Sequence, residues 1–165
     1  MQGSLEQLLD QVAKRGSWLG GGSVVALSAA LSAALLEKLI ANPVQARRLR
    51  RIRQECVALI ERDARAFARV IRASRRGTSR RLFERALQAA TRAPLQVFTH
   101  AQALCAAANA AERSVKPRFR SDLRCALALA RASRDGAKAL ILTNLIWLND
   151  ASYARTVRRH LSRSR

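Results

Sequence analysis

The chain has 165 residues, of which 49% are hydrophobic but only 4% aromatic, and its formal net charge is +20. This length allows one domain with a sizeable core, and the abundant alanine and leucine favour helix over strand. Because strand-forming residues never alternate in clusters, the composition excludes a β-sheet domain. It predicts an all-α fold, a single helical bundle of about six to seven helices with a long central helix.

The positive charge has two interpretations. Only four of the 31 basic residues are lysines, and the arginines are spread along most of the chain. A basic protein can bind nucleic acid or another anionic surface. Arginine and alanine are also the residues that a GC-rich genome favours, and they then lie on solvated helix faces. Stacking aromatics are few and no recognition motif is present, so nucleic acid is a possible but not a favoured partner.

Cysteine and histidine give no metal-binding pattern. Cys56, Cys105 and Cys125 are odd in number, lack metal-like spacing and lie among apolar helical positions. We therefore expect buried free thiols in a reducing compartment. His100 and His160 are far apart and form no motif. The sequence predicts no metal site.

The sequence also gives no sign of a targeting or membrane segment. Its N-terminus is polar, and the longest uncharged apolar stretch, residues 24–36, is shorter than the roughly 20 residues that a membrane span needs. These features predict a cytoplasmic protein that does not bind membranes.

Capping signals divide the chain into helices. Ser4 with Gln7 forms a capping box, Asn42-Pro43 separates the second and third helices, and Thr78 or Ser79 caps the fourth. The predicted helices cover residues 4–14, 23–41, 43–75, 79–93, 94–113 and 121–148, with a short one opening at Asp150 or Ser152 and Pro94 kinking or dividing the helix around it. A helical domain of residues 1–154 and a frayed basic tail of residues 155–165 follow.

A glycine turn precedes the second helix. Gly20, Gly21 and Gly22 allow backbone N–H groups to face a ligand, and the helix dipole adds positive potential there. This suits a carboxylate or an oxyanion formed during a reaction. The alternative is a flexible loop with Ser23 as N-cap. The small residues Ala26, Ala30 and Ala34 that follow fit either a bundle core or a subunit interface.

Asp63 lies within an apolar helical stripe. The stripe contains Leu49, Ile52, Cys56, Leu59, Ile60, Phe67, Val70 and Ile71. Burial is costly for a carboxylate and raises its pKa, which is the property required of a general acid/base near neutral pH. The alternative is a structural ion pair with an arginine of another helix.

Three further polar residues occupy positions of interest. Ser121 and Asp122 stand at a predicted helix start, where the structural interpretation of Asp122 is an N-cap. Asn144 shares an apolar face with Ala137, Ile141 and Leu148. A buried amide there needs a partner, which is either a neighbouring helix or a ligand.

Five motifs occur in the order found in the cyclodeaminase/cyclohydrolase domain of the formiminotransferase-cyclodeaminase family, and the chain resembles a shortened, divergent member of it. They are Leu19-Gly20-Gly21-Gly22-Ser23-Val24-Val25-Ala26, Asp63-Ala64-Arg65-Ala66-Phe67, Ala86 and Ala90 with Pro94-Leu95, Ser121-Asp122, and Gly136-Ala137 with Thr143-Asn144-Leu145 and Asn149-Asp150. The family's proline before the glycines is Leu19 here, and its glycine-lysine pair after the small-residue helix has no equivalent.

The resemblance implies an all-α homodimer that acts on one-carbon derivatives of tetrahydrofolate. One branch of the family closes formiminotetrahydrofolate to methenyltetrahydrofolate with loss of ammonia, and another opens the methenyl bridge with water. By resemblance Asp63 is the acid/base, and Gly20, Gly21, Gly22, Ser23, Ser121, Asp122 and Asn144 bind the substrate. The folate derivative is the substrate and no separate cofactor is implied. Two alternatives remain, a non-catalytic binding or assembly module and an arginine-rich nucleic-acid-binding protein.

Overall fold

The computed structural model of the chain describes residues 4–75 and 79–162, and within these ranges it contains helices and no strand. The helices are α1 (Leu5–Ala13), α2 (Gly21–Leu39), α3 (Pro43–Ala73), α4 (Arg80–Ala111), the short 3₁₀ helix η1 (Pro117–Phe119), α5 (Arg120–Ile146) and α6 (Ala151–Ser162). The predicted all-α fold is therefore confirmed.

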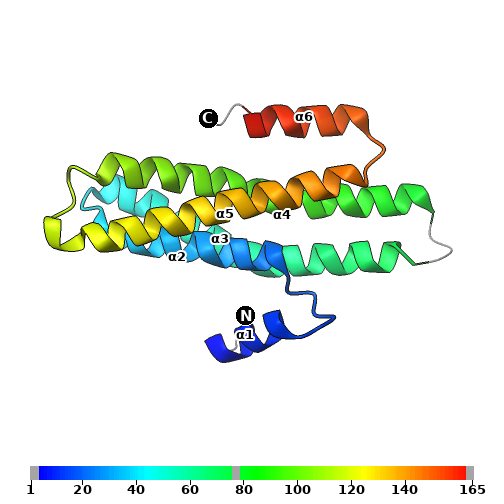
Figure 1. Cartoon of the computed structure of the whole chain (residues 1–165), viewed down its shortest axis with the longest axis horizontal. Helices are drawn as coiled ribbons and strands as arrows, with labels where there is room; N and C mark the ends of the chain where they lie inside the picture. Colours follow the sequence, from blue (N-terminus) through cyan, green and yellow to red (C-terminus); the bar gives the residue numbers. More distant parts are fainter. Residues whose placement is uncertain (1–3, 76–78, 163–165) are drawn as a thin grey trace.

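Four long helices, α2 to α5, form an antiparallel bundle, with α1 on one side of it and α6 on the other (Figure 1). Helix α2 packs against α3 and α5, and α4 packs against the same two helices. The core between them consists largely of alanine and leucine side chains. Because alanine is small, the helix axes lie close together, and many side chains from far apart in sequence meet at the helix contacts.

The contact between α2 and α5 is especially close. Hydroxyl groups cross it: Ser32 Oγ donates to the Ala126 carbonyl oxygen at 2.8 Å, and Ser133 Oγ donates to that of Val25 at 2.7 Å. A Cβ atom added to Gly136 would lie 2.7 Å from Val25 Cγ1, so only glycine fits there without a shift. One face of the small-residue helix thus lies in the bundle core, as one of the two interpretations predicted.

Helix α2 is also long and apolar enough to cross a membrane, judged by length and composition. A core helix of a bundle meets the same criterion, and 44% of the apolar window in α2 is buried inside the protein. The criterion is therefore weak evidence for a membrane span here.

Several predicted caps are confirmed. Ser4 and Gln7 form the capping box of α1, Asn42 Oδ1 accepts from two backbone N–H groups at the start of α3, and Ser79 caps α4. Asp150 Oδ1 accepts from the N–H of Tyr153 at 2.9 Å and so caps α6. Thr78, the other candidate cap of α4, lies outside the described residues.

Two predicted helix starts are wrong. Helix α2 begins at Gly21, which places Ser23 inside the first turn, where its side chain contacts α3 instead of capping α2. Helix α5 begins at Arg120, directly after η1, so the predicted cap Asp122 lies within the first turn. Its carboxylate forms an ion pair with Lys38 Nζ at 3.3 Å, and a negative charge there also suits the helix dipole.

Pro94 neither divides nor ends α4, which is one helix of 32 residues. The proline is buried in the bundle, where packing on both sides of it holds the helix together. Proline has no N–H, so the carbonyl of Ala90, four residues earlier, lacks its usual helical donor.

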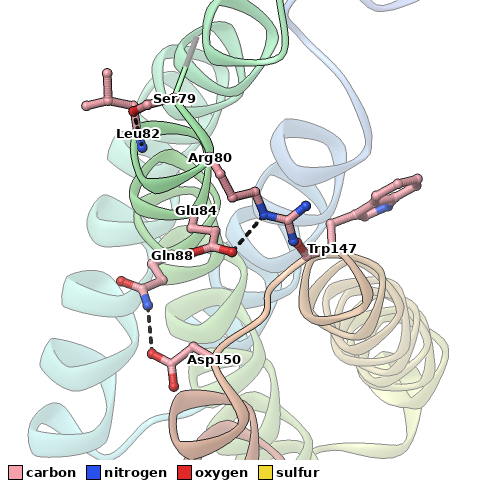
Figure 2. Close-up of polar contacts among 7 residues, drawn as sticks. All are labelled: Ser79, Arg80, Leu82, Glu84, Gln88, Trp147 and Asp150. Atoms are coloured by element: carbon pink, nitrogen blue, oxygen red, sulfur yellow. Dashed lines mark hydrogen bonds and ion pairs between the residues drawn. The ribbon is translucent and has the colours of Figure 1, made fainter.

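The basic C-terminal segment is ordered to Ser162, whereas the sequence predicts fraying from Arg155. Val157 and Leu161 of α6 are buried against the bundle. Figure 2 shows how the turn before α6 is held: Gln88 Nε2 donates to Asp150 Oδ2 at 3.1 Å, and Arg80, which also pairs with Glu84, donates to the Trp147 carbonyl oxygen at 3.2 Å. These contacts join residues far apart in the sequence, so the composition of the C-terminal segment does not reveal them.

The three cysteines are free, but they do not share one environment. Cys56 and Cys105 are buried, as predicted, and burial raises the pKa of the Cys56 thiol to about 12. Cys125 is exposed, which corrects the prediction for this residue. It lies on the side of α5 that faces away from the bundle, because its neighbours Leu123 and Ala126 take the buried positions.

Candidate functional site

A cavity of about 260 Å³ lies at the start of α2 and brings together residues from four parts of the chain. The glycines Gly20, Gly21 and Gly22 form one side, Asp63 of α3 a second and Asn144 of α5 a third. Its other lining residues are Trp18, Phe67, Val70, Ala90, Pro94, Leu140 and Thr143. The bundle thus assembles three of the groups that the sequence singled out.

The Asp63 carboxylate lies directly against the first turn of α2. Gly20, the N-cap residue, supplies no side-chain cap, and the backbone N–H of Ser23 hydrogen-bonds the Asp63 side chain instead. The Ser23 hydroxyl also interacts with Asp63, while its proton is donated to the Ile60 carbonyl oxygen at 3.0 Å. A carboxylate from α3 therefore takes the place of a local cap on α2.

Gly22 makes this approach possible. A Cβ atom built on Gly22 would overlap the Asp63 carboxyl group, whereas one built on Gly21 would meet only Leu140 Cδ2, at an ordinary 3.5 Å. Residue 22 must therefore be glycine, because any side chain there would overlap the Asp63 carboxyl group. The N–H groups of Gly21 and Gly22 have no acceptor within the helix, because they belong to its first turn.

Burial raises the pKa of Asp63 from its ordinary value of 3.8 to about 6. The hydrogen bonds from Ser23 act in the opposite direction, but loss of solvation is the larger effect. Within the described residues no cationic side chain pairs with Asp63, so the alternative of an arginine ion pair is not what the structure has. The carboxyl group can exchange a proton near neutral pH.

Asn144 offers a second polar group, one turn along α5 from Leu140. Its side chain is half-buried, and in the described part of the chain nothing hydrogen-bonds its amide. The neighbouring Thr143 hydroxyl, by contrast, is bound to the Ala139 carbonyl oxygen at 3.0 Å. The Asn144 amide therefore lines the same cavity as Asp63 as a hydrogen-bonding group without a partner among the described residues.

Trp18 and Phe67 add aromatic surface that sequence analysis did not assign to the site. Both line the cavity and both are exposed, at 57% and 43%. They lie where the cavity opens to solvent and provide flat apolar walls for an aromatic ligand. A tryptophan two residues before a glycine run, in a chain with so few aromatics, was the available signal for Trp18.

Ser121 and Asp122 lie outside this cavity. They stand at the other end of α5 from Asn144, and 22 helical residues at 1.5 Å each separate Asp122 from Asn144 by about 33 Å. Ser23 does not line the cavity either, and it reaches the site through its contact with Asp63.

Replacing Gly22 by alanine is expected to destabilise the protein by about 1–3 kcal/mol, because the new methyl group displaces the Asp63 carboxyl. The matched variant Gly21→Ala is expected to be neutral or more stable by up to about 1 kcal/mol, since alanine favours helix. Urea unfolding of both variants measures the difference. Equal stabilities would contradict the assigned contact.

The raised pKa of Asp63 predicts a specific pH dependence. Because the folded-state pKa of about 6 exceeds the ordinary 3.8, the protonated group stabilises the fold below pH 4, and this contribution disappears as pH rises through 6. The unfolding free energy of the wild type should therefore fall relative to that of Asp63→Asn between pH 4 and pH 7. Urea unfolding across this range tests it, and a difference independent of pH would refute the assignment.

Comparisons with known proteins agree with this arrangement. A model of the formiminotransferase-cyclodeaminase family matches residues 4–163. The fold is similar to the crystal structure of formiminotetrahydrofolate cyclodeaminase from Thermotoga maritima, with a TM-score of 0.87 and 23% sequence identity over 99% of this chain and 88% of that one. None of the curated proteins matches the chain. At this identity the structural likeness concerns the fold, and the family match covers nearly every residue, so the chain belongs to the formiminotransferase-cyclodeaminase family.

Proposed function

We propose that the protein is a cyclodeaminase or cyclohydrolase acting on a one-carbon derivative of tetrahydrofolate, with Asp63 as the general acid/base. The observation that carries the proposal is the half-buried Asp63 carboxyl, with a pKa of about 6, in one cavity with the first turn of α2 and the Asn144 amide. Family membership supplies the substrate class.

The cyclodeaminase reaction requires proton transfer at one carbon. The second folate nitrogen attacks the formimino carbon, and the resulting tetrahedral carbon carries an amino group. Asp63 as carboxylate accepts the proton of the attacking nitrogen and, as carboxylic acid, passes it to the former imino nitrogen. With a second proton from solvent this nitrogen leaves as ammonia, and the methenyl product keeps the positive charge. A pKa near 6 populates both forms of Asp63 at neutral pH.

Hydrolysis of the methenyl bridge uses the same carbon and the same group. Water attacks the cationic carbon, and the Asp63 carboxylate accepts the proton that the water loses. As the carbon–nitrogen bond breaks, Asp63 as carboxylic acid returns its proton to the leaving nitrogen, and the hydroxyl group on the carbon loses its proton to solvent to give the formyl product. The free N–H groups of Gly21 and Gly22 and the amide of Asn144 are suited to hold the oxygen or nitrogen atoms around the tetrahedral carbon.

The size of the cavity suggests how the substrate lies. Its volume of about 260 Å³ is below the range of roughly 300–1,000 Å³ typical of sites that enclose a whole ligand. Only the reacting part of a folate fits inside. The flat ring system would then lie against Trp18 and Phe67, where the cavity opens to solvent.

Replacing Asp63 by asparagine is expected to lower the turnover of formiminotetrahydrofolate or methenyltetrahydrofolate at least about 100-fold, because the amide cannot transfer the proton. The spectrophotometric change of the methenyl group measures both reactions. Asp135→Asn, on an exposed carboxylate of α5 outside this cavity, is the control and should retain wild-type activity. Equal activity in wild type and Asp63→Asn would remove Asp63 from the mechanism. A folded wild type without turnover would contradict the enzymatic proposal and favour a non-catalytic binding module.

We further propose that the chain forms a homodimer through α1 and the outer face of α2. The apolar side of α1 is unburied, with Leu5 65% and Leu9 54% exposed, and α1 stands apart from the bundle (Figure 1). The outer face of α2 exposes Val24 and Leu31. A second copy of the chain would bury these two apolar surfaces, which the chain itself leaves exposed.

Leu31→Glu is expected to weaken the dimer at least about tenfold, because it buries a charge in the proposed interface. Leu82→Glu is the matched control, since Leu82 is equally an exposed leucine, at 54%, but lies on α4. Sedimentation equilibrium measures the monomer–dimer constant. A monomeric wild type, or equal weakening by both substitutions, would exclude this interface.

A further inference from the structure

A second cavity, of about 390 Å³, lies between α3 and α4 and shares no residue with the one that holds Asp63. Four arginines line it, Arg62, Arg65 and Arg69 from α3 and Arg92 from α4, and we call it the arginine cavity. The three on α3 are spaced three and four residues apart, so they lie on one face of the helix. Alanines of both helices line it between them.

Nearby carboxylates do not neutralise this cluster. Glu61 is bound by Arg65 at 2.5 Å. Glu55 of α3 is bound by Arg51 at 2.8 Å and by His100 at 3.0 Å, and Arg62 also attracts it without forming an ion pair. Asp63, next to Arg62 in the chain, is hydrogen-bonded to the first turn of α2 instead. All three carboxylates therefore already have other partners.

Arg62, Arg69 and Arg92 keep their guanidinium groups available. Across residues 4–75 and 79–162, none of the three forms an ion pair or a hydrogen bond. Three like charges around one cavity repel each other, and an anion placed between them relieves this repulsion. Guanidinium groups bind oxyanions in pairs of parallel hydrogen bonds, which gives such a site geometric selectivity as well as charge.

We propose that the arginine cavity is a binding site for a compact multivalent oxyanion, a group with several negative oxygens on neighbouring phosphates or carboxylates. The size of the cavity favours a small ligand over a nucleic-acid strand, and its lining contains no aromatic side chain on which a base would stack. An adjoining larger cavity shares Leu59, Arg62 and Gln96 with it, so an organic ligand has room to extend beyond its anionic end.

Isothermal titration calorimetry with inorganic pyrophosphate and with citrate tests the site in 0.1 M salt, where diffuse attraction is screened beyond about 10 Å. We expect saturable binding of one anion per chain, and the tighter of the two probes identifies phosphate or carboxylate as the natural group. The triple variant Arg62→Gln, Arg69→Gln, Arg92→Gln should weaken it at least about tenfold, because each removes a charge-assisted contact.

A second triple variant, Arg47→Gln, Arg48→Gln, Arg124→Gln, removes the same charge from exposed arginines outside the cavity. It should bind within about twofold of the wild type. Equal weakening by both triple variants would show attraction to net charge only and overturn the proposal. Absence of saturable binding to either probe, in wild-type protein with an intact thermal transition, would overturn it as well. Tighter, unsaturable binding of a DNA oligonucleotide would also overturn it.

Discussion

Asp63 lies against the first turn of α2, and the rest of the site depends on this contact. The carboxylate accepts a hydrogen bond from the backbone N–H of Ser23 and so caps α2. The helix can therefore begin at Gly21, two residues before its first polar side chain. The approach is possible only because residue 22 is glycine. Burial at the same contact raises the pKa of Asp63 to about 6. One interaction therefore both caps the N-terminus of α2 and provides a group able to exchange protons.

The small side chains between α2 and α5 set the remaining geometry. Ser32, Ser133 and Gly136 let the two helices approach closely. The hydroxyl groups of the two serines hold the helices in one register. This register places Leu140 and Asn144 of α5 across the cavity from the glycine turn. The packing of small side chains therefore positions the residues that line the cavity as directly as the polar contacts do.

Basic residues occupy two different environments on this surface. Five of the eight ion pairs that the structure describes join an arginine to a glutamate at the protein surface, where such a pair contributes little stability. The unpaired guanidinium groups between α3 and α4 are different, because they converge on a cavity. The net charge of +20 therefore comes both from arginines spread over the helix surfaces and from the arginines that gather at this cavity.

Local patterns made much of the fold predictable. Asn42-Pro43 and Ser4 with Gln7 mark helix starts because their side chains satisfy backbone groups a few residues away. Asp63 stood out because helical periodicity put a carboxylate among apolar neighbours. Patterns of this kind could not reveal Trp18 as a lining residue, since its role arises from where the loop before α2 folds.

The sequence by itself determined that the chain is helical, that its motifs occur in the order found in a known family, and that Asp63 lies within an apolar helical stripe. Each of these follows from residues near one another in the chain. Only the tertiary structure decided that α4 continues through Pro94, that α6 is ordered, and that Ser121 and Asp122 lie far from the cavity. It also decided the partner of Asp63, which is the first turn of α2 and not an arginine. These features depend on contacts between helices distant in sequence, whose packing no local pattern records.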